Sequence, residues 1–297
     1  MNDYLYSVIL GIIEGLTEFL PISSTAHLRI AQALLHIPLD SGYWKMYTIV
    51  IQLGAILCLP IYFGGRIAKL LSTFPRGESG DRTILTHPLS LTLVAFVTTA
   101  IPGLLLTKVI GENLESLTII GASLLIGGLV MWAVDARSRA SEAAGKDAPH
   151  SRIRTWQMER MTFTQAVWIG ACQILSAVFP GVSRSMSTIS AGQLAGMSRA
   201  SALEFSFFLS MPTMAAATGY DLLKSLLGGE ENPLGVSGID AHGWAVLGIG
   251  FVVSFIVAYA AVAWFMSWVR YRGLVPFAVY RIATGIAVLV WALSSGS

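Results

Sequence analysis

Charged residues are scarce in this sequence, and so are cysteines. Only 12% of the 297 residues are charged, about half the share of a typical soluble domain, which argues against a soluble globular protein. The net charge of +2, from 19 basic and 17 acidic residues, excludes a basic nucleic-acid-binding protein. The two cysteines, Cys58 and Cys172, both lie in apolar runs, which excludes a disulfide framework and a cysteine-ligated zinc site. Hydrophobic residues make up 54% of the chain, as expected for a protein of the lipid bilayer.

The few charges are unevenly distributed along the chain. Most lie in polar stretches between long apolar runs, but seven lie inside or at the edge of the apolar runs. These seven are Glu14, Glu18, Arg29, Arg184, Arg199, Glu204 and Arg281. An ionisable side chain in hydrocarbon is energetically costly, so a charge at such a position usually serves a function. Each of the seven is therefore a candidate functional residue.

Six apolar segments are long enough to cross a bilayer, which takes about 20 residues. They are about 45–63, 88–107, 117–134, 202–220, 242–268 and 274–293. The loops 64–86, 135–160 and 269–273 carry arginines and lysines, whereas 109–116 and 221–240 are acidic. The positive-inside rule then places the first three loops in the cytoplasm and the other two outside. The apolar start lacks the basic region and cleavage site of a signal peptide, so we expect it in the mature protein.

Two further apolar segments, 5–35 and 163–198, must each begin and end on the same side of the membrane. Each consists of two apolar halves separated by a proline, Pro21 or Pro180. With 31 and 36 residues, they are too short for two crossings and a turn. We therefore predict two re-entrant helical hairpins, one from each face. Non-helical backbone at that depth is tolerated only where it is buried in protein or lines a wet cavity, so a polar site is expected at the breaks.

A weak internal repeat agrees with this topology. At an offset of 159, Glu14-Gly15-Leu16-Thr17 corresponds to Gln173-Ile174-Leu175-Ser176, Pro21 to Pro180, and Ser24 to Ser183, while a slightly different offset pairs Gln52 with Glu204. The predicted fold is a single all-α polytopic membrane domain spanning 1–297, with six spanning helices and two re-entrant hairpins. It forms an inverted-topology repeat, with half one at about 1–134, a cytoplasmic loop at about 135–160 and half two at about 161–297. Inverted repeats place their site near the midplane, where the broken helices meet.

The first candidate site group is a pair of carboxylates. Glu14 and Glu18 lie four residues apart, so on a helix they share one face. Two unneutralised carboxylates would repel each other, and the pair therefore requires a cation, a shared proton or a basic partner. Oxygen ligands of this kind suit Mg²⁺ or Ca²⁺. The alternative is a structural pair that accepts hydrogen bonds from loop amides.

Hydroxyl groups and a histidine follow the first proline. Ser23, Ser24 and Thr25 are followed by His27. One of the serines can simply be the N-cap of the second half-helix. The free N–H groups of that helix end also favour an anion. His27 is a candidate general acid or base, with a packed histidine as the alternative.

The second break carries an arginine among small and hydroxyl residues. Gly181, Ser183, Arg184, Ser185 and Thr188 lie within nine residues of Pro180. The planar guanidinium matches the oxygens of a phosphate or carboxylate, so we predict a phosphate-binding loop. The alternative is a capped turn whose arginine pairs with one of the two carboxylates.

The other buried charges have weaker interpretations. Glu204 can form a structural ion pair with Arg199 or Arg281, and we favour that over a catalytic role. Arg199 can instead extend to the inner membrane surface, and Arg29 to the outer headgroups. Through its repeat relation to Glu204, Gln52 is a candidate site-lining residue, as is Glu204 itself.

At these positions the sequence resembles the undecaprenyl-diphosphate phosphatase family, the bacterial bacitracin-resistance proteins. The matching stretches are Glu14 through Thr25 with His27, Pro180 through Ser185 with Thr188, Gln52-Leu53-Gly54, Glu204-Phe205-Ser206-Phe207, and Pro276-Phe277 with Tyr280-Arg281. The resemblance extends over nearly the whole chain. Ala26 and Met186 stand where the family usually has glycine, which removes two flexible points beside the expected phosphates.

The resemblance implies an enzyme that removes the terminal phosphate from undecaprenyl diphosphate and so regenerates the lipid carrier of cell-wall precursors. It also implies a divalent cation, Mg²⁺ or Ca²⁺, and a multi-pass protein of the bacterial inner membrane whose site and termini lie on the periplasmic side. The expected partners are a polyprenyl diphosphate lipid and membrane lipids, with no nucleic acid and a homodimer left open. The alternative function is a transporter or flippase of a lipid phosphate or another anion, since inverted repeats with broken helices are typical of transporters.

The expected roles of the site residues follow from the same comparison. Ser24 is the candidate nucleophile, activated by Glu18 or His27, and a metal-bound water is the rival. His27 otherwise protonates the leaving group. Glu14 and Glu18 hold the metal or orient the nucleophile. The groups expected to bind the substrate phosphates are Ser23, Thr25, Ser183, Arg184, Ser185 and Thr188.

Overall fold

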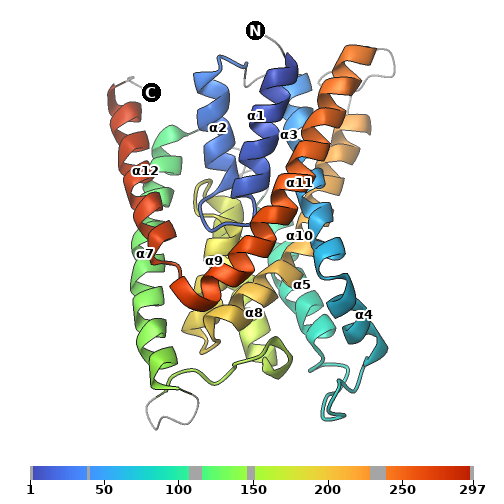
Figure 1. The fold of residues 1–297 in the computed structure, drawn as a ribbon, viewed down its shortest axis with the longest axis vertical. Helices are drawn as coiled ribbons and strands as arrows, with labels where there is room; N and C mark the ends of the chain where they lie inside the picture. Colours follow the sequence, from blue (N-terminus) through green and yellow to red (C-terminus); the bar gives the residue numbers. More distant parts are fainter. Residues whose placement is uncertain (1–2, 39–40, 107–115, 146–150, 228–238, 295–297) are drawn as a thin grey trace. The chain divides into compact units, whose positions relative to one another are not determined.

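A computed structural model describes residues 3–38, 41–106, 116–145, 151–227 and 239–294 of the chain. This part contains eleven α-helices, one short 3-10 helix and no strand beyond a single isolated bridge between Thr155 and Met197 (Figure 1). The α-helices are α1 (Asp3–Thr17), α2 (Ser24–Leu34), α3 (Gly42–Tyr62), α4 (Gly64–Ser72), α5 (Pro88–Leu105), α7 (Leu117–Ala144), α8 (Phe163–Val178), α9 (Arg184–Leu194), α10 (Arg199–Leu227), α11 (Ala241–Arg272) and α12 (Val275–Ser294). The all-helical fold class predicted from the sequence is confirmed.

Five helices of the described part are long and apolar enough to cross a membrane: α3, α5, α7, α11 and α12. They coincide with five of the six expected spans. The sixth, 202–220, lies within α10, which is not among these five. A multi-pass membrane protein is therefore supported, while the full arrangement of six spans stays a prediction. Most of the two expected acidic loops, 109–116 and 221–240, lies outside the described residues.

The expected boundary of the third span is wrong. Helix α7 continues to Ala144, ten residues into the segment expected to be a loop from 135 onward. This stretch is polar, but it contains neither glycine nor proline and consists largely of residues that tolerate a helix. The helix ends at Gly145, whose φ of 87° suits glycine far better than other residues.

Each expected hairpin segment consists of two helices separated at its proline. Helices α1 and α2 have 15 and 11 residues, and α8 and α9 have 16 and 11. All four are shorter than the roughly 20 residues needed to cross a bilayer. Helix α1 packs against α2, and α8 against α9. The breaks are where the sequence places them, and a re-entrant path through the membrane stays a prediction.

The chain forms two compact units that interleave along the sequence. The first comprises residues 1–20, 24–64 and 210–263, and the second comprises 21–23, 65–209 and 264–297. The units do not coincide with the expected repeat halves, since each takes residues from both. The division of the domain into repeat halves therefore stays a prediction.

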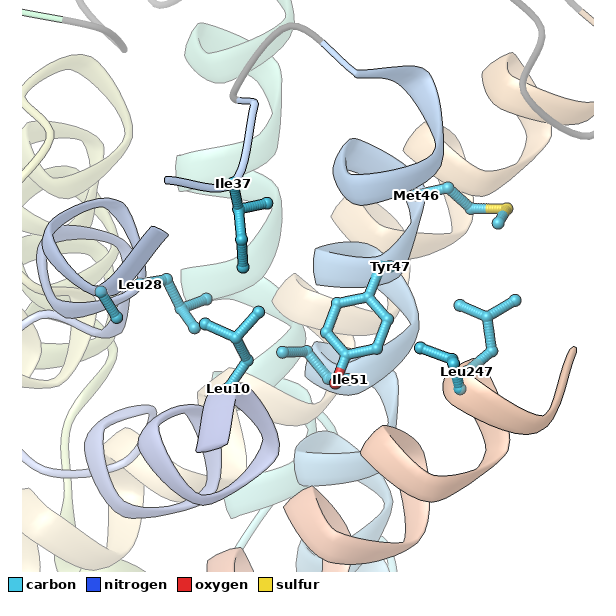
Figure 2. Packing of buried hydrophobic residues seen from close by; sticks show 9 residues of the cluster. Leu10, Leu28, Ile37, Met46, Tyr47, Ile51 and Leu247 are labelled. Atoms are coloured by element: carbon cyan, nitrogen blue, oxygen red, sulfur yellow. The ribbon is translucent and has the colours of Figure 1, made fainter. Parts of the chain in front are cut away.

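The first unit is built around an apolar cluster and close helix contacts. The cluster includes Leu10, Leu28, Ile37, Met46, Tyr47, Ile51 and Leu247 (Figure 2). Glycines let α11 approach α1 and α3: a Cβ at Gly15 would lie 2.7 Å from the Ser254 carbonyl oxygen, and one at Gly54 would lie 2.5 Å from that of Phe251. Such close approach is typical of membrane helices, which pack through small residues. It fixes the stretch of α1 that carries Glu14.

The second unit contains two closely packed helix pairs. Helix α12 packs along α7, and α5 packs along α8. A Cβ at Gly285 would lie 2.6 Å from the Leu125 nitrogen, and one at Gly170 would lie 2.4 Å from the Ala95 carbonyl oxygen. The Thr99 hydroxyl also donates a hydrogen bond to the Gly170 carbonyl oxygen at 2.7 Å. These contacts hold the hairpin that carries Arg184.

Candidate functional site

Both predicted carboxylates are buried at the end of α1, in the first unit. Glu14 is 1% exposed and Glu18 is 8% exposed. The Glu18 N–H donates to the Glu14 carbonyl oxygen at 2.9 Å, so helical geometry extends one residue beyond the formal end of α1. The two side chains therefore share one helix face, as their spacing predicts.

The structure brings Ser24 and Glu18 together. The Ser24 hydroxyl, at the start of α2, donates a hydrogen bond to Glu18 Oε2, and the Ser24 side chain is buried. A hydroxyl bonded to a carboxylate has the arrangement of a nucleophile beside a general base. His27 lies half-buried on the next turn of α2, while Thr25 is exposed.

The two breaks share an unusual backbone conformation. Ser23 and Ser183, each directly before the second helix of its hairpin, have φ values of 73° and 70°. Non-glycine residues rarely adopt this left-handed region, and such strain is often found at functional sites. The shared conformation pairs Ser23 with Ser183, so the offset that pairs Ser24 with Ser183 is wrong by one residue. The second break has one more residue after its proline, and Gly181 there has a φ of 95°.

The predicted phosphate-binding loop forms the start of α9 in the second unit. Ser183 is the N-cap, and its hydroxyl accepts a hydrogen bond from the Met186 N–H at 3.4 Å. The hydroxyls of Ser183 and Ser185 lie 3.1 Å apart. Helix α9 thus begins with Arg184, with its first N–H groups next to two buried hydroxyls. An anion is favoured at such a helix end.

The hydroxyl of Thr188 is already occupied by protein groups. It donates to the Arg184 carbonyl oxygen at 2.9 Å and lies 2.6 Å from the Ser206 hydroxyl on α10. Thr188 is 1% exposed. Its contacts indicate that it anchors α9 to α10, a contact between side chains 18 residues apart that local sequence spacing does not reveal.

Arg281 joins the two breaks, a role that sequence reasoning missed. The side chain is fully buried, and its Nη1 donates to the Pro21 carbonyl oxygen at 3.1 Å. Its Nη2 donates to the carbonyl oxygens of Gly181 at 2.8 Å and Ser123 at 3.2 Å. The turn after α1 and the turn after α8 are therefore held by one guanidinium within the second unit. The only signal in the sequence is an arginine inside an apolar run.

The expected ion pair of Glu204 is wrong. Glu204 bonds to Arg66 Nε at 2.8 Å rather than to Arg199 or Arg281, and Arg66 also contacts Glu159. Burial lowers the pKa of Arg66, but its bonds to the two carboxylates outweigh this and raise the pKa overall. Glu204 lines a cavity of about 470 Å³ in the second unit, whose lining includes none of the predicted phosphate-binding residues.

Two other expectations concern Arg199 and Gln52. Arg199 does not extend freely to the membrane surface, because its Nε bonds to Glu142 Oε2 at 2.6 Å and lies 3.9 Å from Asp135 Oδ1. Gln52 Oε1 accepts a hydrogen bond from the Thr218 hydroxyl at 3.4 Å in the first unit. The role of Gln52 in lining a site stays a prediction.

The two glycine-to-larger departures have different surroundings. Ala26 is fully buried on α2. Met186 is also buried, and its Cε lies 2.8 Å from the place where a Cβ of Gly127 would stand. Met186 therefore fills space beside α7, and the loop before it keeps its cap.

The donors for a metal are limited to the carboxylate pair. Within the described ranges no group of three or more histidine, cysteine, aspartate or glutamate side chains could hold a metal ion. Mg²⁺ often binds through one or two carboxylates together with substrate phosphates and water. Glu14 and Glu18 fit that pattern.

Comparison with known proteins gives matches along almost the whole chain. A family model described as bacitracin resistance protein BacA matches residues 7–287. A protein of Koribacter versatilis (strain Ellin345) named undecaprenyl-diphosphatase is 64% identical over 295 residues, with 99% of both chains covered. Proteins of the same name from Rhizobium etli (strain CIAT 652) and Caldanaerobacter subterraneus subsp. tengcongensis are 41% and 38% identical, over 98% and 97% of this chain and 98% and 96% of their own. This chain belongs to the bacitracin resistance protein BacA family.

Proposed function

We propose that this protein hydrolyses undecaprenyl diphosphate to undecaprenyl phosphate and inorganic phosphate. The relatives that carry the name undecaprenyl-diphosphatase match it over almost their full length. The observation that carries the proposal is the hydrogen bond from the Ser24 hydroxyl to the Glu18 carboxylate in a buried site. The reaction recycles the lipid carrier of cell-wall precursors, in keeping with the bacitracin resistance for which the family is named.

The membrane arrangement that we propose has six spans and two re-entrant hairpins in inverted orientation. The lengths of α1, α2, α8 and α9, each too short to cross, support it. The protein would lie in the bacterial inner membrane with both termini and the reacting groups on the periplasmic side. The basic loops that the sequence assigns to the cytoplasm support this orientation.

We assign the bond-making step to Ser24 and Glu18. Glu18 accepts the hydroxyl proton while Ser24 Oγ attacks the terminal phosphorus, and the bond from that phosphorus to the bridging oxygen breaks. His27 on the same helix protonates the leaving group or, in the alternative assignment, activates Ser24. Water then releases inorganic phosphate from the serine. In the rival route Glu18 orients a water molecule that attacks directly.

Arg184 and the start of α9 hold the transferring phosphoryl group in this proposal. Phosphoryl transfer depends mainly on positioning and on stabilising negative charge. The guanidinium, the hydroxyls of Ser183 and Ser185 and the free N–H groups of the helix end supply both. Ser23 and Thr25 would contact the second phosphate.

A divalent cation, Mg²⁺ or Ca²⁺, would neutralise phosphate charge when bound by Glu14 and Glu18. We expect a chelator to lower phosphate release from detergent-purified protein at least about 10²-fold, and added Mg²⁺ to restore it. Glu14→Gln should have low activity that no longer responds to the chelator. Full activity in excess chelator contradicts the metal assignment.

The same assay separates the phosphatase from a transporter. An enzyme releases phosphate from undecaprenyl diphosphate in detergent, where no two-sided membrane exists, whereas a transporter does not. Absence of phosphate release from well-folded protein under all metal conditions contradicts the proposed function.

Arg184→Ala is expected to lower kcat/KM about 10²–10³-fold, because it removes a cation that stabilises developing negative charge. Phosphate release across a range of substrate concentrations measures kcat and KM separately. Arg139→Ala, an exposed arginine on α7, is the matched control. Unchanged kcat and KM in Arg184→Ala contradict the role of this guanidinium.

A further inference from the structure

A cavity of about 370 Å³ lies in the second unit at the end of α9 opposite Arg184. With 11 residues in α9, the two ends are about 16 Å apart. The last turns of α7, the segment 151–154 and the last residues of α9 line it. The volume is in the range of small-ligand sites, and no residue of the proposed reaction lines it.

The lining is basic. It includes Arg137, Arg152 and Arg154 and no aspartate or glutamate. None of these arginines takes part in an ion pair within the described part of the chain, whereas Arg66 and Arg199 are both paired with carboxylates. Three guanidiniums without a carboxylate favour an anionic ligand.

A buried amide in the same cavity also indicates a ligand. Gln193 is 7% exposed, and neither Oε1 nor Nε2 has a hydrogen-bond partner among the described residues. A buried amide is costly unless it is hydrogen-bonded. Ser138, also buried, adds a hydroxyl to the lining. The amide N–H₂ and the hydroxyl are donors suited to phosphate oxygens.

The arginine side chains are not required to cap α9. The final carbonyl oxygens of this helix and of the turn after it accept hydrogen bonds from other donors: Ala191 from the Ala195 N–H and the Trp168 indole, Gly192 from the Met197 N–H, Gln193 from the Gly196 N–H, and Gly196 from the Arg154 and Thr155 N–H groups. These bonds also reduce the negative partial charge of the helix end. The guanidiniums are therefore available to a ligand.

The position of the cavity favours a lipid over a soluble anion. Arg137 follows the apolar part of α7, a candidate membrane span, and Trp132 on the same helix is 50% exposed. Leu194, on the cavity wall, is 54% exposed. Guanidiniums beside exposed apolar side chains at the end of a span suit a phosphate headgroup attached to acyl chains.

We propose that this cavity binds the phosphate group of an anionic membrane lipid. The site is separate from the residues assigned to phosphate release and does not depend on the proposed function. Its polar donors contact the phosphate, and its exposed apolar rim contacts the chains.

The test measures binding of phosphatidylglycerol and phosphatidylcholine to the full chain in detergent by native mass spectrometry. Phosphatidylglycerol is expected to bind more tightly than phosphatidylcholine. Its affinity should fall about fivefold for each arginine removed, so about 25-fold in the Arg152→Gln/Arg154→Gln variant. Arg76→Gln/Arg139→Gln, which removes two exposed arginines outside the cavity, is the matched control and should bind like wild type.

Further arms separate the remaining explanations. Gln193→Met keeps the charge and should still weaken phosphatidylglycerol binding, so it tests the site even if the double variant folds poorly. Equal losses in the control variant, or equal binding of phosphatidylcholine, overturn the proposal. So does displacement of the lipid by inorganic phosphate at comparable concentration, which would indicate a site for free phosphate. A loss of binding in Arg184→Ala alone would place the lipid at the residues of the proposed reaction.

Discussion

Replacing Glu18 by glutamine is expected to lower the kcat of phosphate release about 10²–10⁴-fold and to leave thermal stability nearly unchanged. Ser24 donates a hydrogen bond to Glu18 Oε2, and the amide oxygen of glutamine can still accept that bond. The substitution therefore removes the negative charge and the ability to take a proton while it preserves shape. Phosphate release and Tm measured on the same preparation report the two effects.

The partner substitution tests whether the two residues act as one unit. Ser24→Ala should cause a similar loss, and the double variant should lose little more than the worse single variant, because groups that act together are non-additive. Ser72→Ala, an exposed hydroxyl on α4, is the control. Near-full turnover in Ser24→Ala excludes attack by this hydroxyl and leaves the water route. Losses that multiply in the double variant argue against a coupled pair.

The apolar helices could be predicted from the sequence because a bilayer leaves little choice. A run of about 20 apolar residues satisfies its backbone groups in lipid only as a helix, and five of the six expected spans coincide with such helices. The end of α7 could not be predicted in the same way. Hydropathy reports where a chain leaves lipid, but the helix continues until Gly145 provides a stop.

The candidate site was predictable where its geometry is local. The four-residue spacing of Glu14 and Glu18 and the two prolines are sufficient to indicate a shared face and two breaks. The partner of Glu204 was not, because Arg66 lies 138 residues away in the sequence and several arginines were equally suitable by charge. The repeat was misaligned because identity favoured matching prolines, whereas the backbone pairs Ser23 with Ser183 through a shared positive φ.

Arg281→Met is expected to destabilise the protein by about 3–5 kcal/mol, because three buried carbonyl groups lose a charged donor. The carbonyl groups belong to Pro21, Ser123 and Gly181. Two of these residues lie in the turns that precede Ser24 and Arg184. Displacement of either turn should lower kcat about 10²-fold with a smaller change in KM, since a misplacement of about 1 Å has that effect on a reacting group. Chemical denaturation and steady-state kinetics give the two quantities.

A substitution that keeps the arginine separates its position from its charge. A Cβ at Gly127 would lie 2.3 Å from Arg281 Nη2, so Gly127→Ala should push the guanidinium away from its carbonyl groups. We expect the same direction of change in kcat and stability as in Arg281→Met, with a smaller magnitude. Gly103→Ala on α5 is the control, because a Cβ there meets no atom within 4 Å, and it should behave like wild type. Wild-type kcat and stability in Gly127→Ala would mean that the turns keep their positions without this guanidinium, and that the buried charge acts by another route.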